Sequence, residues 1–167
     1  MIEQHYIDDC LFQLRKLKSQ ADKAMAQVDD AQFFALLDPE ANSIALLVKH
    51  VSGNMRSRWT NFLTSDGEKP DRHRDTEFER DADDTRLAVM GRWDEAWELL
   101  FNTLSSLKPS DLGKTVTIRD EPHTVVQAIN RQVSHYSAHV GQIVLLAKHF
   151  AGTRWQTLSI PKRKSSR

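Results

Sequence analysis

Two histidines, His135 and His139, stand four residues apart in a stretch whose apolar residues recur with a helical period. On an α-helix, side chains at this spacing project from the same face, with Cβ atoms about 5 to 6 Å apart. Two imidazoles placed in this way can chelate one metal ion. The apolar residues of the stretch are Ile129, Val133, Val140, Ile143, Val144 and Ala147. Because burying two unpaired polar rings on such a helix would be costly, the pair predicts a polar partner such as a metal.

A third ligand would have to come from another helix, and His50 is the best candidate because it lies in a largely apolar run, residues 44–51. Three neutral imidazoles with a fourth position open to water, thiol or substrate suit a catalytic metal better than a closed structural one. The same residues also fit a plainer interpretation, in which they are surface or hydrogen-bonded core histidines. Spacing alone favours neither interpretation. The remaining histidines are expected to be exposed rather than to bind metal: His5, His73, His123 and His149.

Other polar residues could complete a site around these histidines. Arg131 lies one turn before His135 and could pair with the carboxylate or another anionic group of a cofactor, although a surface arginine fits equally well. Gln142 lies three residues after His139 and could hydrogen-bond to it. Two further residues are expected to be packing or capping partners: Asn54 and Tyr136. No residue is identified as a catalytic acid or base.

Four long amphipathic helices are predicted to position these residues. Apolar residues recur at three- and four-residue steps over about 3–28, 44–63, 85–107 and 122–150. A turn and capping residues at 38–42 precede the second helix, and Asp83 or Asp84 caps the third. Each helix has one apolar stripe, and four such stripes are buried most simply in a four-helix bundle. The predicted fold class is therefore all-α.

The segments between these helices differ in character. Residues 64–84 contain few apolar residues and are predicted to form a long solvated connection. Residues 115–118 alternate like a short β segment before the last helix, which Pro122 is expected to open. The predicted organisation is one bundle domain, 1–152, followed by a C-terminal segment and solvated tail, 153–167.

Composition excludes several classes of function. The chain has 23 basic and 23 acidic residues, so its formal charge of zero argues against a nucleic-acid or membrane-surface partner. The single cysteine, Cys10, excludes an internal disulfide framework and fits a reducing compartment. The N-terminus is acidic where a signal peptide would be basic, and no apolar run reaches the roughly 18 residues of a membrane span. A cytoplasmic protein is therefore expected, and the candidate metal site suggests a small-molecule substrate as its partner.

Several blocks of the sequence together resemble the DinB/YfiT-like metalloenzyme superfamily, in a branch catalogued as a domain of unknown function. The blocks are His50, the run His135-Tyr-Ser-Ala-His139-Val-Gly141-Gln142-Ile143, the connection 62–70 and the segment 155–162. The resemblance covers nearly the whole chain. It implies an up-down-down-up four-helix bundle, a divalent metal, with zinc or nickel as first candidates, held by His50, His135 and His139, and a homodimer.

The superfamily includes thiol-dependent enzymes, so the resemblance also suggests a metal-dependent thiol S-transferase. A low-molecular-weight thiol would then be the cosubstrate, because a metal at the open position favours the nucleophilic thiolate. Fold and metal do not by themselves determine a reaction. The alternative is a non-catalytic metal-binding or ligand-sensing bundle, with a role in a stress response suggested only by the family name.

Overall fold

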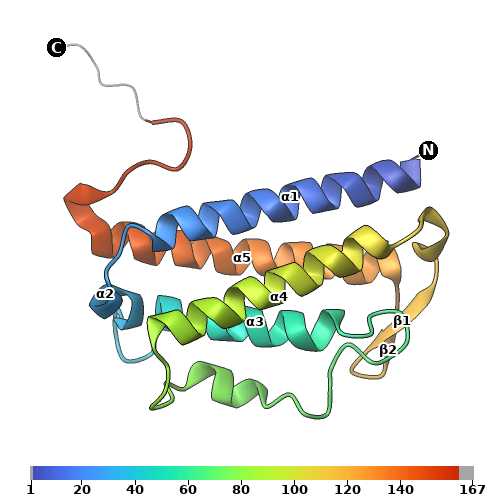
Figure 1. Ribbon diagram of the computed structural model, residues 1–167, viewed down its shortest axis with the longest axis horizontal. Helices are drawn as coiled ribbons and strands as arrows, with labels where there is room; N and C mark the ends of the chain where they lie inside the picture. The colour runs from blue at the N-terminus through green and yellow to red at the C-terminus, as the bar shows by residue number, and fades with distance from the viewer. Residues whose placement is uncertain (1, 162–167) are drawn as a thin grey trace.

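The computed structural model describes residues 2–161 and is mostly helical, which confirms the predicted class. Its four long helices are α1 (Ile2–Met25), α3 (Ile44–Trp59), α4 (Arg86–Ser106) and α5 (Val125–Ala151). In Figure 1, α1 and α5 run from right to left, whereas α3 and α4 run from left to right. Helix α1 packs against α4 and α5, and α3 also packs against α4 and α5. The four helices therefore enclose one core.

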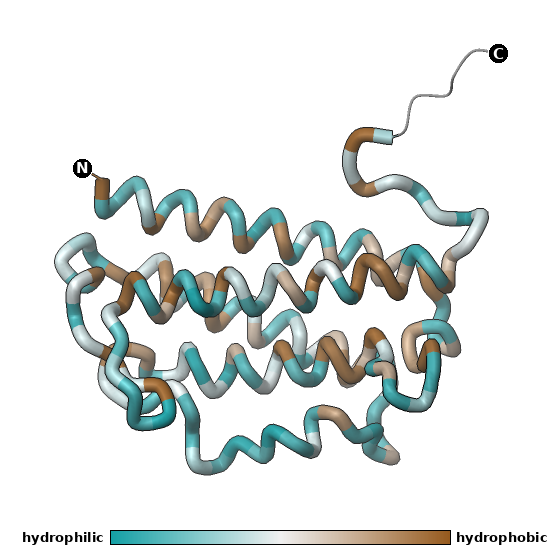
Figure 2. The backbone as a smooth tube through the Cα atoms, turned by 180° about the vertical axis from the view of Figure 1, so that it is seen from behind, coloured by the Kyte–Doolittle hydropathy of each residue, from teal (hydrophilic) through white to brown (hydrophobic). Residues whose placement is uncertain are grey.

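The core lies along the inner faces of these helices. Apolar and polar residues alternate along each helix with the helical period, as the brown and teal segments of Figure 2 show. Trp93 and Trp97 on α4 meet edge to face, with ring centroids 5.4 Å apart. The large side chains that are almost completely buried include Trp59, Trp93, Trp97, Tyr136, Phe33, Leu14 and Met55. These bulky residues hold the helices at fixed separations and so fix the positions of α3 and α5.

The first two helix boundaries differ from the prediction. Helix α1 ends at Met25, and a short helix, α2 (Asp30–Phe34), follows it. Asp29 starts α2 because its side chain accepts a hydrogen bond from the backbone of Gln32, which hydrogen-bonds back to Asp29. Helix α3 ends at Trp59 rather than near 63, because Asn61 adopts a left-handed conformation with φ of 50°.

The N-cap residue of α4 was also wrongly predicted, whereas no single cap was predicted for α3. Ser43 caps α3, and Thr85 caps α4. Asp84 does not cap α4 because its carboxylate is bonded instead to Lys49 and Arg92. These long-range ion pairs leave the capping position to the next residue along the chain.

A β-hairpin precedes α5, and only its first strand was predicted. Strand β1 (Thr115–Ile118) pairs antiparallel with β2 (Glu121–Thr124), and Pro122 lies in β2 opposite Thr117. The prediction that Pro122 opens the last helix is therefore wrong. The turn residues between the strands have positive φ, which is typical of a two-residue hairpin. Helix α5 begins instead after Thr124, whose side chain caps it.

The connection between α3 and α4 is not simply solvated. It contains a 3-10 helix, η1 (Arg74–Phe78), which packs along α3 and lies below it in Figure 1. Glu77 in η1 is buried. A stretch with few apolar residues is thus folded onto the bundle, because the buried carboxylate of Glu77 is paired with Arg72 of the same connection and hydrogen-bonded to His50 of α3. Two further 3-10 turns are η2 (Pro109–Asp111) and η3 (Gly152–Arg154).

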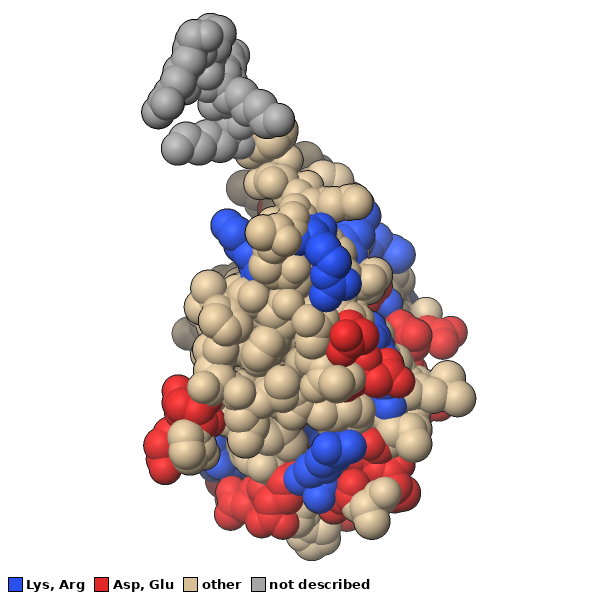
Figure 3. Space-filling model, turned by 90° about the vertical axis from the view of Figure 1, so that its left-hand side faces the viewer, with Lys and Arg blue, Asp and Glu red and all other residues tan. Residues whose placement is uncertain are grey.

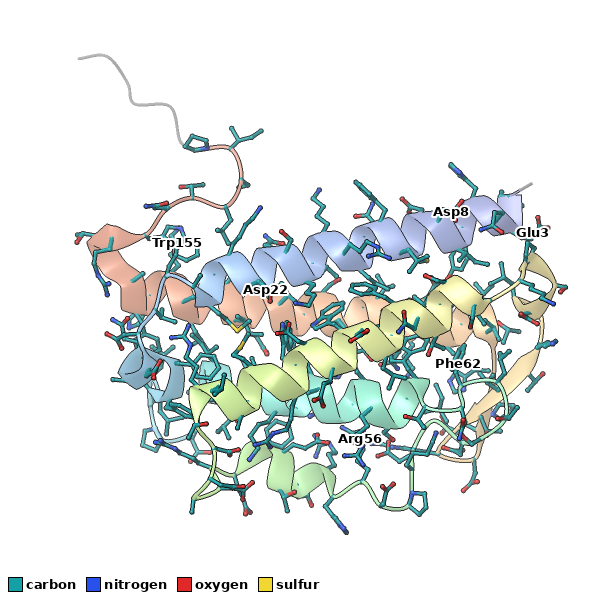
Figure 4. The ribbon with its side chains drawn as sticks, in the orientation of Figure 1. Glu3, Asp8, Asp22, Arg56, Phe62 and Trp155 are labelled. Atoms are coloured by element: carbon teal, nitrogen blue, oxygen red, sulfur yellow. The ribbon has the colours of Figure 1, made fainter. Side chains whose placement is uncertain are left out.

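The chain leaves α5 at Gly152, whose φ of +56° favours glycine. Trp155 then packs against the core beside the end of the bundle (Figure 4). The last residues of the predicted tail, 162–167, lie outside the described residues. At the end of the molecule where α2 lies, basic and acidic side chains are interspersed around an uncharged area (Figure 3). Within residues 2–161, no helix is both long enough and apolar enough to span a bilayer.

Candidate metal centre

Helices α3 and α5 bring together His50, His135 and His139. The ring centroid of His50 lies 5.3 Å from that of His135 and 4.9 Å from that of His139. The centroids of the pair on α5 are 4.5 Å apart. Each residue offers one nitrogen, and these nitrogens all lie within 4.8 Å of one another. The three side chains thus converge on one position, although they come from parts of the chain that are far apart in sequence.

Hydrogen bonds orient two of the imidazoles. Nδ1 of His50 donates to Oε2 of Glu77 at 2.8 Å, and Nδ1 of His139 donates to Oε1 of Gln142, also at 2.8 Å. With Nδ1 protonated in both rings, Nε2 carries the free lone pair. Nε2 of His135 is buried and has no hydrogen-bond partner among the described residues. This set of free nitrogens is the arrangement that metal-binding histidines show.

Glu77 is itself held by a network of charges. Arg72 donates to both carboxylate oxygens of Glu77 at 2.9 Å and also pairs with Glu68 at 3.2 Å. Burial alone would raise the pKa of Glu77, but the hydrogen bonds from His50 and Arg72 outweigh it and lower the pKa. Glu77 is therefore ionised, and it fixes the direction of the His50 ring.

Close packing on α3 makes room for this carboxylate. A Cβ atom at Gly53 would lie 2.7 Å from Cδ of Glu77, and nearer still to Oε1. Any larger residue at position 53 would therefore displace the Glu77 side chain. Phe78, the next residue of η1, stacks on the ring of His50 with centroids 4.7 Å apart. Gly53 thus leaves room for the Glu77 side chain, and Phe78 packs against the His50 ring that Glu77 binds.

The sequence analysis missed Glu77, Arg72 and Phe78. They lie in a charged connection without periodicity, and the spacing of Glu77 from His50 carries no local signal. The resemblance of residues 62–70 to the family was the only indication that this connection has a defined structure. Only the folding of η1 onto α3 places the carboxylate beside His50.

The surroundings keep the imidazoles on α5 neutral. Burial, followed by the repulsion that a proton on His135 would meet from a protonated His139 or His50, lowers the pKa of His135 to about 4. Burial also lowers the pKa of His139, although its hydrogen bond with Gln142 opposes this effect. Because only a neutral imidazole nitrogen can coordinate a metal, both rings are ready to bind one at neutral pH.

A cavity of about 250 Å³ adjoins the histidines. Its lining comes from α3, α5, the α3–α4 connection and the hairpin, and consists of His50, Asn54, Arg58, Arg72, Arg74, Arg119, Arg131, Gln132 and His135. The structure thus places Arg131 at the same cavity as His135. Gln142 lies at His139 instead, as its hydrogen bond shows.

Asn54 and Tyr136 are hydrogen-bonded to each other beside this cavity. The Tyr136 hydroxyl donates to Oδ1 of Asn54 at 3.0 Å and accepts from Nε1 of Trp59 at 3.0 Å. Burial raises the pKa of Tyr136, although the hydrogen bond from Trp59 opposes this effect. Tyr136 is therefore a neutral packing partner, whereas Asn54 also lines the cavity.

The other potential ligands lie outside this centre. Asp81, Asp83 and Asp84 form a group of acidic side chains, but Asp84 and Asp81 bind the buried ammonium of Lys49 at 2.6 and 2.9 Å. That ion pairing accounts for Asp81 and Asp84, two of the three members of the group. Cys10 is buried in the core on α1, as an inert small residue would be. The remaining histidines are half-buried or exposed: His5, His73, His123 and His149.

Comparison with known proteins gives a family but no established activity. No curated protein matches the chain. A family model described as "Protein of unknown function (DUF1572)" matches residues 1–164. Because the match spans nearly the whole length, this chain belongs to the DUF1572 family.

Proposed function

We propose that the protein is a divalent-metal-dependent enzyme whose metal is held by His50, His135 and His139. The observation that carries this proposal is the convergence of three imidazole nitrogens from α3 and α5 within 4.8 Å of one another. Three protein ligands are typical of catalytic metal sites, which keep a position for water or substrate. Zinc or nickel would suit this all-nitrogen donor set.

The donor set fits a metal for a reason beyond proximity. A buried nitrogen without a hydrogen-bond partner destabilises a fold, and Nε2 of His135 is such a nitrogen. Coordination would satisfy this nitrogen. Glu77 and Gln142 meanwhile hold the opposite nitrogens of His50 and His139, as carboxylates and amides do in metal sites.

The resemblance to the DinB/YfiT-like superfamily supports a more specific function, a thiol S-transferase. A divalent ion in such a site supplies a Lewis-acidic position that favours the deprotonated form of a bound thiol. The chain's own residues orient the ligands through Glu77 and Gln142, and Phe78 covers one face of His50. The helix directions in Figure 1 support membership of this superfamily, because they match its up-down-down-up order.

Elemental analysis of protein purified without a histidine tag tests the metal. We expect close to one divalent ion per chain in the parent and loss of that ion in His50→Ala, His135→Ala and His139→Ala. His149→Ala is the matched control, because His149 is exposed on the same helix, α5. Circular dichroism would establish that the variants remain folded. Metal retained in folded protein that carries all three substitutions together would refute the proposal.

Turnover tests the reaction. Metal-loaded protein is assayed with cellular thiols and a chromogenic electrophile such as 1-chloro-2,4-dinitrobenzene. We expect thiol consumption above the uncatalysed rate, abolished in His139→Ala. Metal binding without any turnover would reject the transferase and favour the alternative of a non-catalytic metal-binding or ligand-sensing bundle.

A further inference from the structure

The cavity beside the histidines is unusually rich in arginine. Five of its nine lining residues are arginines, and no aspartate or glutamate from residues 2–161 is among them. The whole chain has no net charge, so this concentration is local. Because two metal-ligand candidates, His50 and His135, also line it, a molecule in the cavity would lie against the proposed metal centre.

Nearby carboxylates neutralise this charge only in part. Glu68 is shared by three of the arginines: Arg72 and Arg119 at 3.2 Å, and Arg58 at 3.5 Å. Arg72 also binds Glu77. Two carboxylates thus face several guanidinium groups, and a surplus of positive charge remains at the cavity.

Arg131 and Arg74 add to that surplus. Arg131 contacts the ring of His123 at 3.4 Å and pairs with no carboxylate among the described residues. Arg74 pairs at 3.3 Å with Asp75, whose side chain is almost fully exposed, so solvent screens that pair strongly. Both guanidinium groups are therefore available to a ligand in the cavity.

Buried atoms without hydrogen-bond partners gather at the same cavity. In the described part of the chain, five buried side-chain polar atoms lack a partner, and four of them belong to residues that line it. They are Nε and Nη1 of Arg58, Oε1 of Gln132 and Nε2 of His135. Arg58 is only 3% exposed, so water compensates its guanidinium poorly. Of these atoms, the two nitrogens of Arg58 are donors, and folded proteins rarely leave buried donors unsatisfied, which indicates that a ligand supplies their acceptors.

The geometry points to a small anionic ligand: we propose that this cavity binds the carboxylate or phosphate group of the substrate, with Arg58 and Arg131 as its main contacts. That the ligand is a substrate rests on the proposed metalloenzyme function, whereas the anion site rests on the arginines themselves. Guanidinium groups match both kinds of oxyanion with paired hydrogen bonds. The volume of about 250 Å³ restricts the ligand to a small molecule.

Calorimetric titration with sodium phosphate and, separately, sodium acetate tests the site at constant ionic strength. The variants are Arg131→Gln, at an exposed position that should not affect folding, and Arg58→Met, which removes the buried cation. Arg56→Gln is the matched control, because Arg56 lies on α3 with Arg58 but is 80% exposed and does not line this cavity (Figure 4). Metal content is measured on every sample, and each titration is run with and without metal.

We expect saturable binding of at least one anion, weakened about tenfold or more in Arg131→Gln and Arg58→Met and changed less than twofold in Arg56→Gln. The tighter of the two anions identifies the ligand group as phosphate or carboxylate. Absence of saturable binding, or equal weakening in all three variants, would overturn the proposal. If the parent protein took up no divalent metal when it was supplied but still bound the anion through these arginines, the metalloenzyme would be refuted and the anion site would stand.

Discussion

Lys49 and Arg58 are both buried cations on α3, but the protein surrounds them in opposite ways. The ammonium of Lys49 donates to the Glu79 carbonyl at 2.6 Å and to the carboxylates of Asp81 and Asp84 at 2.9 and 2.6 Å. Burial alone would lower the pKa of Lys49, but the hydrogen bonds and charges of Asp84 and Asp81 outweigh it and raise the pKa. All three donors of Lys49 thus have acceptors within the fold.

Arg58 has only a distant ion pair, with Glu68 at 3.5 Å, and burial lowers its pKa. Two of its nitrogens have no partner among residues 2–161. A buried cation whose donors are all satisfied holds elements together, whereas one with free donors is available to a ligand. Lys49 is therefore a structural cation, whereas Arg58, on the same helix, is a cation that can bind a ligand.

The largest effect is expected from Lys49→Met. The substitution leaves Asp84, whose side chain is only 1% exposed, without its main counter-charge. Loss of one partner of a buried ion pair costs about 3 to 5 kcal/mol, so we expect the free energy of unfolding in urea to fall by that amount. A loss below about 1 kcal/mol would mean that Arg92, which also binds Asp84, compensates on its own.

Glu77→Gln tests a carboxylate whose partners are all found within the protein. The amide cannot accept from His50 and from Arg72 as the carboxylate does, so the His50 ring loses its orientation. Changes to such partners of metal ligands typically weaken metal binding about 10- to 100-fold, and we expect this range in a chelator competition assay. Glu79→Gln, at an exposed position in the same connection, is the control and should leave the affinity unchanged.

His135 resembles Arg58 in having a buried nitrogen without a hydrogen-bond partner among the described residues. Burial of this ring makes the stability of the protein depend on pH. Its pKa is about 4 in the folded protein and about 6.5 when unfolded, so between these values only the unfolded state takes up the proton. The stability of metal-free protein should therefore fall as pH drops from about 6.5 to 4. We expect His135→Gln to lose about 1 kcal/mol less than the parent over this window, a reduced figure because the ring is partly exposed. Identical pH profiles in urea denaturation would contradict this.

The smallest effect on stability is expected from Arg58→Met. The variant removes a poorly compensated cation and keeps much of the apolar stem, so the free energy of unfolding should change by less than about 1 kcal/mol. Paired with Lys49→Met, this measurement directly tests the comparison. Equal destabilisation by the two substitutions would show that Arg58 is as structural as Lys49.

The helices were largely predictable because their signals are local. Apolar residues at three- and four-residue spacing identified α1, α3, α4 and α5, and the same spacing placed His135 and His139 on one face. The boundaries were less accurate where distant contacts intervene, as at Asp84. Strand β2 was missed because Pro122 is compatible with both an edge strand and the first turn of a helix.

The sequence by itself determined the helical class, the paired imidazoles and the choice of His50 as their candidate partner. Tertiary structure alone decided that Glu77 supports His50, that Arg131 shares a cavity with His135, and that Arg58 is buried without partners. The physical reason is range. Helical periodicity is encoded within a few residues, whereas the burial and pairing of a charge depend on which remote segments pack around it.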